Sequence, residues 1–174
     1  MNQCCNLARQ AIRCYLENGT VLKPPEDLPE EFFNRQCGVF VTIKNGNHLR
    51  GCIGTYLPTK ENVAQEIIEN AIAVATRDGR FQPVSRDEID GLTFEVSLLQ
   101  EPKQILDLSN HDPKIYGLIV KSVDFPYKTG ILLPALEKVD APEKQFMIAC
   151  QKAGINHSKE NIEIYRFTVE KYQN

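Results

Sequence analysis

The chain has 174 residues, of which 42% are hydrophobic and 25% charged, and its formal net charge is -3. This length suits one domain, and no run of about 18 apolar residues exists that could cross a bilayer, so a membrane partner is not expected. Lysine and arginine are spread evenly and form no basic stripe, which disfavours nucleic acid as a partner.

The N-terminal third predicts a helix followed by a β-hairpin. Apolar residues recur at helical spacing over 7–16, and Asn18-Gly19 supplies a left-handed end to that helix. Alternation over 39–43 predicts a strand, and Asn45-Gly46 is a strong hairpin signal because both residues tolerate positive φ. A second strand over 48–56 is therefore expected to pair with the first.

The middle third predicts a long helix, a helical turn and a strand. Thr59 can cap a helix that runs from about residue 60 to residue 77 and carries one apolar stripe. Ser85 and Glu88 have the spacing of a capping box for a short helical turn. Alternating apolar and polar residues over 92–98 then predict a half-buried strand.

The last third predicts two short strands over 117–123 and 130–133, followed by a helix. Asp140 with Glu143 forms the expected capping pair of that helix, and Gly154 ends it. A final strand is expected over 162–169. Strands in hairpins with helices inserted at intervals predict an α+β fold with a mostly antiparallel sheet and flanking helices.

The segment over 49–55 is the main candidate site, because it combines a thiol, a fixed cation and two glycines. If the strand is regular, its period of two places His48, Arg50 and Cys52 on one face. Cys52 then acts as a nucleophile, and the guanidinium of Arg50 lowers the thiol pKa from its usual value near 8.5. Arg50 can instead clamp a carboxylate or a phosphate of the substrate.

Each of these residues also has a simpler interpretation. Cys52 can be a small core residue. Gly51 and Gly54 can let a ligand or a second backbone approach closely and leave nearby N–H groups accessible as oxyanion donors, or they can merely bend the strand. His48 can be a general base or a surface residue beside the hairpin turn. The sequence alone leaves these alternatives open.

Two charged residues outside this segment are further candidates for ligand binding. Arg80 can bind an anion, or it can satisfy the last carbonyls of the preceding helix. Glu95 can be a proton-transfer group, a paired carboxylate or a solvated residue of its strand.

The cysteines and histidines predict neither disulfides nor a metal site. The chain is large enough to fold without bridges, so free thiols are expected, and the cysteines outside the candidate segment are assigned to packing or to chance exposure. There is no Cys-X-X-Cys pair, and the three histidines stand far apart in sequence, so no metal ligation is expected. The N-terminus lacks a signal-peptide pattern, which predicts a cytoplasmic location.

The chain resembles the AMMECR domain family, whose signature is similar to Leu49-Arg50-Gly51-Cys52-Ile53-Gly54 of this sequence. Further segments follow the family pattern in the same order, so the resemblance covers nearly the whole chain; they lie at 38–42, 78–84, 95–99, 130–134 and 150–154. The resemblance implies one domain over residues 1–174 made of two intertwined lobes, a larger mixed lobe and a smaller one, with a cleft between them.

The resemblance implies no settled activity. Some microbial relatives are fused to, or encoded beside, a radical S-adenosylmethionine protein and a Memo-like protein, which implies a shared redox or modification pathway. We therefore expect either an enzyme that uses Cys52 with Arg50, or a non-catalytic module that grips a peptide or a small anionic ligand. Binding of single-stranded nucleic acid through exposed aromatic residues is a weaker alternative, since the charge balance opposes it. The sequence indicates no particular cofactor, substrate, protein partner or oligomeric state.

Overall fold

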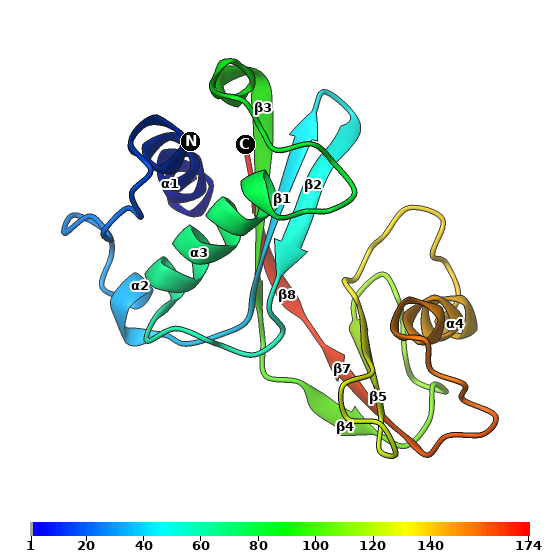
Figure 1. Cartoon of the computed structure of the whole chain (residues 1–174). Coiled ribbons are helices and arrows are strands. Elements are labelled where there is room, and N and C mark those ends of the chain that lie inside the picture. Colours follow the sequence, from blue (N-terminus) through cyan, green and yellow to red (C-terminus); the bar gives the residue numbers. More distant parts are fainter. Residues whose placement is uncertain (1) are drawn as a thin grey trace. The chain divides into compact units, whose positions relative to one another are not determined.

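The computed structural model describes residues 2–174, which divide into two compact units. Unit 1 runs to Leu98 and includes Glu170–Asn174, whereas unit 2 is Leu99–Val169. Each unit contains its own four-stranded sheet and its own helical layer (Figure 1). The predicted α+β fold with antiparallel pairing is confirmed. The cleft inferred from the family resemblance stays a prediction.

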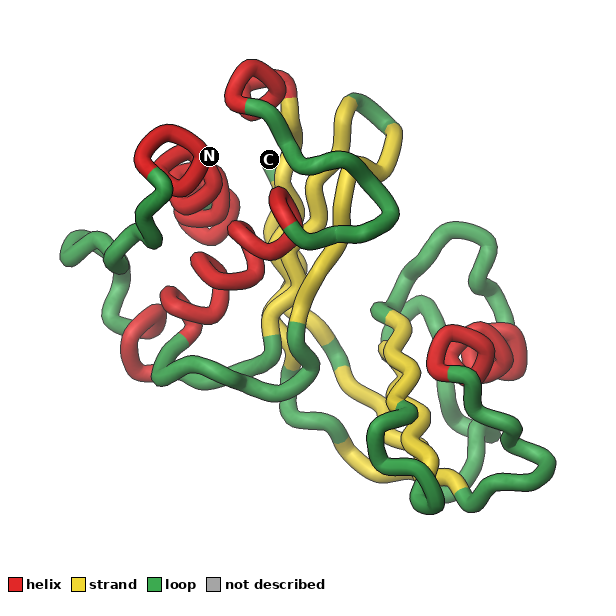
Figure 2. The backbone as a smooth tube through the Cα atoms, viewed as in Figure 1, coloured by secondary structure: helices red, strands yellow, loops and turns green. Residues whose placement is uncertain are grey.

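Sheet A belongs to unit 1 and has the strand order β2-β1-β3-β8. Its strands are β1 (Val39–Asn45), β2 (His48–Gly54), β3 (Leu92–Leu99) and β8 (Val169–Gln173). The helices of unit 1 cover one face of this sheet (Figure 2). They are α1 (Gln3–Asn18), α2 (Glu31–Asn34) and α3 (Val63–Thr76), with the 3-10 helix η1 (Arg86–Gly91) leading into β3.

Alternation along the strands separates an apolar face of sheet A from a polar one. Val39, Val41 and Ile43 of β1 are fully buried in the core beneath the helices. We use the name polar face for the opposite side of the sheet, which carries Thr42 and Glu95 as paired neighbours on β1 and β3. Because the side-chain period of a strand is two, the same alternation that builds the core also gathers these polar groups.

Sheet B belongs to unit 2 and has the strand order β4-β7-β5-β6. Its strands are β4 (Lys103–Ile105), β5 (Gly117–Ser122), β6 (Thr129–Leu132) and β7 (Ile162–Phe167). The helix α4 (Pro142–Ala153) packs on β6 so closely that a Cβ added at Gly130 would meet the carbonyl oxygen of Ala149. This approach brings the apolar residues of α4 and of β5 into one core.

Several predicted elements are confirmed, among them the opening helix with Gly19 at φ 68, the hairpin of β1 with β2 and the capping box of Ser85 with Glu88. The turn of the hairpin is Gly46-Asn47, because Asn45 still belongs to β1 and pairs with His48. Three details are wrong. The long helix begins at Val63 with Asn62 as its cap, and Asp140 does not cap α4, since its carboxylate is paired with Lys144. The strand predicted over 162–169 ends at Phe167 as β7 of sheet B, and a further strand that was not predicted, β8, follows in sheet A from Val169.

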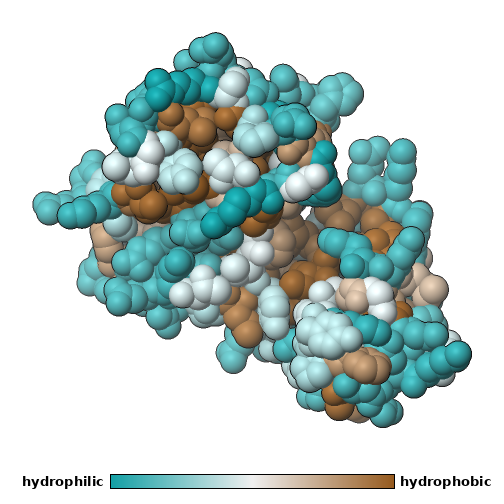
Figure 3. Space-filling model, viewed as in Figure 1, coloured by the Kyte–Doolittle hydropathy of each residue, from teal (hydrophilic) through white to brown (hydrophobic). Residues whose placement is uncertain are grey.

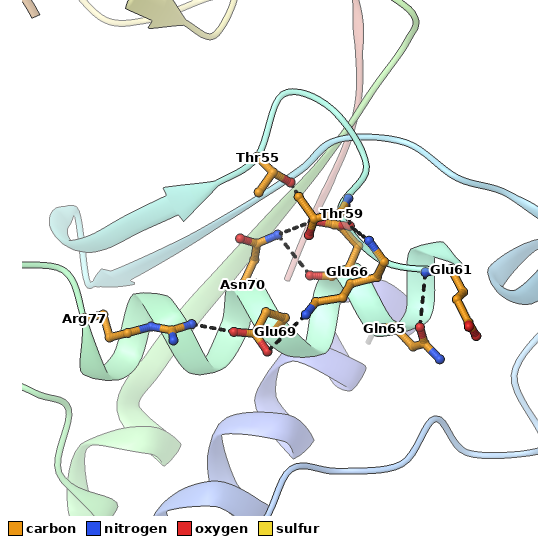
Figure 4. Close-up of polar contacts among 9 residues, drawn as sticks. Thr55, Thr59, Glu61, Gln65, Glu66, Glu69, Asn70 and Arg77 are labelled. Carbon is orange, nitrogen blue, oxygen red and sulfur yellow. Dashed lines mark hydrogen bonds and ion pairs between the residues drawn. The ribbon is translucent and has the colours of Figure 1, made fainter. Parts of the chain in front are cut away.

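A buried carboxylate fixes the loop that follows β2 (Figure 4). Glu66 of α3 is 1% exposed and accepts hydrogen bonds from the hydroxyl of Thr55 (2.7 Å) and from the backbone N–H groups of Thr59 (2.7 Å) and Lys60 (2.8 Å). The side-chain amide of Asn70 donates a further bond at 3.3 Å. Burial alone would raise the pKa of Glu66, but these donors outweigh it and hold the pKa below its ordinary value of 4.5.

Hydrophilic residues cover much of the face drawn in space-filling form, with smaller hydrophobic areas among them (Figure 3). Within residues 2–174, no helix combines the length and the apolar character that a bilayer span requires.

Candidate functional site

The strand β2 contains a β-bulge at Arg50. Gly51 pairs with Ile43 of β1 and Leu49 pairs with Lys44, so the register shifts and Arg50 faces no partner residue. An extra residue of this kind breaks the strict alternation of side chains along the strand. The residues before and after the bulge therefore do not share a face in the way that a regular strand would require.

The bulge separates the three residues that were expected to share one face. Cys52 pairs with Thr42 and lies with it on the polar face. His48 pairs with Asn45, whose alternation places it on the opposite side of the sheet, and its side chain is exposed near the hairpin turn. The prediction that His48, Arg50 and Cys52 share a face is therefore wrong.

The guanidinium of Arg50 is bound to a carboxylate of η1. Its Nε donates to Oε1 of Glu88 at 3.0 Å and its Nη2 donates to Oε2 at 3.1 Å, while the side chain of Arg50 is 16% exposed. A further bond from Nη2 reaches the carbonyl of Pro83 at 3.3 Å. This two-point contact, which lowers the pKa of Glu88, occupies the donors that were expected to clamp a substrate anion.

β2 is an edge strand of sheet A, and residues of the loop after α3 form hydrogen bonds with the backbone of Cys52 at this edge. The carboxylate of Asp78 accepts a hydrogen bond from the N–H of Cys52 at 2.9 Å, and Arg80 donates to the carbonyl of Cys52 at 3.0 Å. Arg80 is itself bound to both oxygens of Asp78, at 2.9 and 2.8 Å. The N–H of Cys52 is thus not an accessible oxyanion donor, and Arg80 contacts the candidate site rather than capping a helix.

Asp78 is a residue of this site whose role the sequence did not indicate. Its neighbours in the chain suggested a helix end, and only the fold brings its carboxylate to the edge of β2. Hydrogen bonds from Arg80 and from the N–H of Cys52 lower the pKa of Asp78 from 3.8 to about 2. The same contact raises the pKa of Arg80, so the pair is held as two charges.

We expect Asp78 to stabilise the protein only above acidic pH. Since its pKa is depressed in the folded state, its contribution of about 2 kcal/mol is complete above the unfolded value near 3.8 and is lost as the pH falls through about 2. Urea unfolding of wild type and Asp78→Asn at a series of pH values measures this. The difference in free energy of unfolding between the two proteins should be largest at neutral pH and should decrease below about pH 4.

The matched control is Asp87→Asn, which removes an exposed carboxylate from the neighbouring helical turn and should leave the unfolding free energy nearly unchanged. If the difference in free energy of unfolding between wild type and Asp78→Asn stayed constant down to pH ~2, the ion pair of Asp78 with Arg80 would not be the source of that difference.

The two glycines of the segment are required by packing. A Cβ at Gly51 would lie 2.8 Å from Cγ2 of Val74 on α3, and one at Gly54 would lie 2.3 Å from Cγ of Phe40 and 2.4 Å from the carbonyl oxygen of Val39. Cβ atoms in real structures essentially never lie closer than 3.0 Å to such neighbouring atoms, so a side chain at either position would force its neighbours to move. The interpretation in which these glycines admit a second backbone therefore explains both positions.

The polar face brings a thiol, a hydroxyl and a carboxylate into one row across three strands. Thr42 pairs with Cys52 on one side and with Glu95 on the other. The hydroxyl of Thr42 donates to Sγ of Cys52 at 3.2 Å, and the side chain of Cys52 is half-buried. Glu95 is a paired carboxylate, with Lys44 at 3.4 Å and Lys171 at 3.3 Å.

Other cysteines differ from Cys52 in their surroundings. All six are free thiols, as predicted. Burial raises the pKa of Cys4 to about 12 and that of Cys5 to about 11, and it also raises the pKa of Cys150, so these thiols stay protonated. Cys14 is half-buried like Cys52, and its sulfur lies 3.6 Å from the hydroxyl of Thr20. Among residues 2–174, no group of three or more His, Cys, Asp or Glu side chains is placed to hold a metal ion.

Comparison with known proteins shows similarity over nearly the whole chain. The family model described as AMMECR1 matches residues 5–172. A protein of Thermotoga maritima is 50% identical over 167 residues, which are 95% of this chain and 94% of that protein. A protein of Clostridium acetobutylicum is 40% identical over 96% of this chain, which spans only 35% of that longer protein. The crystal structure of an uncharacterized protein from Pyrococcus horikoshii has a TM-score of 0.89 at 34% identity, covering 98% of this chain and 89% of that one.

Proposed function

The chain belongs to the AMMECR1 family, and from that premise we propose that it is a cytoplasmic enzyme whose reactive group is the thiolate of Cys52. One observation carries the proposal. The sulfur of Cys52 is half-buried on the polar face and accepts a hydrogen bond from Thr42, whereas its own N–H and carbonyl are fixed by Asp78 and Arg80. A nucleophile whose position is fixed at its backbone and at its sulfur needs little reorganisation to react.

Each neighbour has a stated role in this proposal. The hydroxyl of Thr42 stabilises the ionised sulfur by donating to it, and the guanidinium of Arg80 supplies a positive charge at the carbonyl of the same residue. Arg50 acts as a positioning residue, because its bonds to Glu88 anchor β2 to η1 on one side of the reactive cysteine. Glu95 lies two strands from Cys52, about 10 Å across the sheet, and so acts on the bound molecule rather than on the sulfur.

We further propose that the reaction belongs to a pathway shared with radical S-adenosylmethionine and Memo-like proteins, as the family resemblance implies. The length of the Clostridium acetobutylicum relative supports this, because its region similar to the present chain is joined to a longer additional sequence. Fusion of two sequences in one chain keeps their sites at a high effective concentration.

Alkylation of the native protein tests the role of Cys52. Iodoacetamide reacts with a thiolate when sulfur forms a bond to the methylene carbon and iodide leaves. Cys52 should be alkylated about tenfold faster than Cys14, which is also half-buried but has no guanidinium bound to its backbone. Peptide mapping by mass spectrometry over a time course gives both rates in the same sample.

The variant Thr42→Val removes the donor to sulfur with little change of shape and should slow the alkylation of Cys52 alone. Thr20→Val is the matched control at Cys14 and should leave the rate at Cys52 unchanged. Equal rates at Cys52 and Cys14 in the wild-type protein would refute the enzyme proposal.

The second candidate is a non-catalytic module that binds a peptide or a small anionic ligand. Its supporting observation is that packing and ion pairing explain Gly51, Gly54 and Arg50 without any reaction. If the protein is such a module, the Cys52→Ala variant should bind the ligand as the wild type does. If the protein is an enzyme, the same variant should fold normally but lose all turnover.

A further inference from the structure

His111 of unit 2 is buried, and one nitrogen of its imidazole ring has no hydrogen-bond partner. The residue is only 5% exposed, and its Nε2 lies 2.6 Å from Oε1 of Gln145, which is fully buried on α4. Among residues 2–174, no group forms a hydrogen bond with Nδ1 of His111. A buried polar atom without a partner costs free energy, so its persistence calls for a physical explanation.

The side-chain amide of Gln145 determines which nitrogen of His111 carries the proton. Nε2 of Gln145 donates to the carbonyl of Tyr116 at 3.2 Å and to that of Leu133 at 3.4 Å, so its Oε1 is the acceptor. Nε2 of His111 therefore donates to this oxygen, and in the neutral ring Nδ1 holds the free lone pair. The unused group is thus an acceptor, and it is also the nucleophilic nitrogen of the ring.

A strained segment follows β6 in the same unit. Residues 133–139, which we call the gate segment, contain Ala135 at φ 55 and Lys138 at φ 64. No other residue among 2–174 apart from glycine has a positive φ. An L residue in this region brings its Cβ close to the following carbonyl oxygen, which costs free energy at each such position. The folded structure therefore holds this segment in an unfavourable conformation.

The gate segment is bonded to the loop that carries His111. The N–H of Ala135 donates to the carbonyl of Pro113, in that loop, at 2.8 Å. The carbonyl of Leu133 accepts from the same Gln145 amide that holds the imidazole. The strained backbone and the unused acceptor thus belong to one set of contacts within unit 2.

We propose that the gate segment opens and closes over His111, and that the structure shows the closed form. Opening releases the strain at Ala135 and Lys138, and it gives Nδ1 of His111 access to a molecule with an N–H or O–H donor. These gains offset the hydrogen bonds that are lost, so the open form is populated at about 0.1–10%. The device is independent of the chemistry proposed for Cys52.

Acylation by diethyl pyrocarbonate measures the opening. The lone pair of Nδ1 forms a bond to a carbonyl carbon of the reagent, ethyl carbonate leaves, and the proton of Nε2 passes to the solvent. Peptide mapping by mass spectrometry gives the rates at His111 and at the exposed His48 and His157 in one sample. In the native protein His111 should react about tenfold to a thousandfold more slowly than His48, in proportion to the open population.

The variant Ala135→Gly removes the strain and keeps the backbone N–H. Glycine adopts positive φ freely, so the closed form gains and the rate at His111 should fall about fivefold, which corresponds to about 1 kcal/mol. Ala141→Gly is the matched control, because Ala141 has a φ of -128 and carries no such strain. It should not slow the reaction of His111, and the rates at His48 and His157 should be the same in all three proteins.

A third variant, Val120→Ala, separates local opening from the unfolding of unit 2. Val120 is fully buried on β5, so its truncation destabilises the core, whereas the rate at His111 should stay at the wild-type value. A rate that rose with the loss of stability would show that His111 reacts only after unfolding, and would overturn the gate. An unchanged or faster rate in Ala135→Gly would also overturn it, as would a wild-type His111 that reacts as fast as His48 or not at all.

Discussion

Replacement of Glu66 by alanine should lower the free energy of unfolding by about 4 kcal/mol, since it removes the acceptor of several buried donors at once. The N–H groups of Thr59 and Lys60 would lose their partner, as would the hydroxyl of Thr55 and the amide of Asn70 (Figure 4). Urea unfolding monitored by circular dichroism measures the change, and the loop that follows β2 should also lose protection from hydrogen exchange.

The control lies one turn along the same helix. Glu69 is partly exposed and paired with Arg77 and Lys60, so Glu69→Ala should cost less than about 1 kcal/mol. The pKa of Glu66 is below 4.5 in the folded state, and its stabilising effect is therefore complete above that pH and declines as the pH falls through the folded value. Equal losses for Glu66→Ala and Glu69→Ala would contradict the buried role of Glu66.

Introduction of a methyl group at Gly54 should destabilise the protein by about 3 kcal/mol and slow the alkylation of Cys52. The added Cβ would lie 2.3 Å from the ring of Phe40 and 2.4 Å from the carbonyl oxygen of Val39, and the backbone oxygen cannot rotate away. The end of β2 would have to separate from β1, which would disturb the pairing of Cys52 with Thr42. Thermal unfolding and the alkylation rate give two independent readouts.

Gly91→Ala is the matched control for Gly54→Ala, because a Cβ at Gly91 meets no atom within 4 Å. The free energy of unfolding of Gly91→Ala should lie within about 0.5 kcal/mol of the wild-type value, and Cys52 should be alkylated at the wild-type rate. A Gly54→Ala protein as stable as Gly91→Ala would mean that β2 tolerates the extra carbon.

The sequence predicted those elements whose signals are local. Gly46 and Gly19 specify their turns through positive φ, and the hydrophobic alternation of β1 and β3 was sufficient to place both strands. The strand β8 was not predicted, because the sequence VEKYQ over Val169–Gln173 shows no apolar alternation. The short helix α2 and the strand β4 were missed, since neither is long enough to show a period.

The candidate site was predicted in its residue types but not in its geometry. Alternation assigns faces correctly only where a strand is regular, and although Gly51 could indicate an irregular strand, it does not specify a bulge at Arg50. The contacts of Asp78 with Cys52, and of Lys171 with Glu95, join residues that are far apart in the chain. Such long-range contacts follow from strand order, which a single sequence does not specify.

The outer strand β8 of sheet A (Val169–Gln173) follows its neighbour β3 (Leu92–Leu99) by some seventy residues in the sequence. During synthesis on the ribosome, the nascent chain can therefore bury the apolar side of β1, β2 and β3 before β8 is available to pair with the outer edge of β3. Lys171 belongs to β8, so its ammonium group reaches Glu95 only after β8 has been synthesised. A truncated translation product would carry the thiol without the second cation.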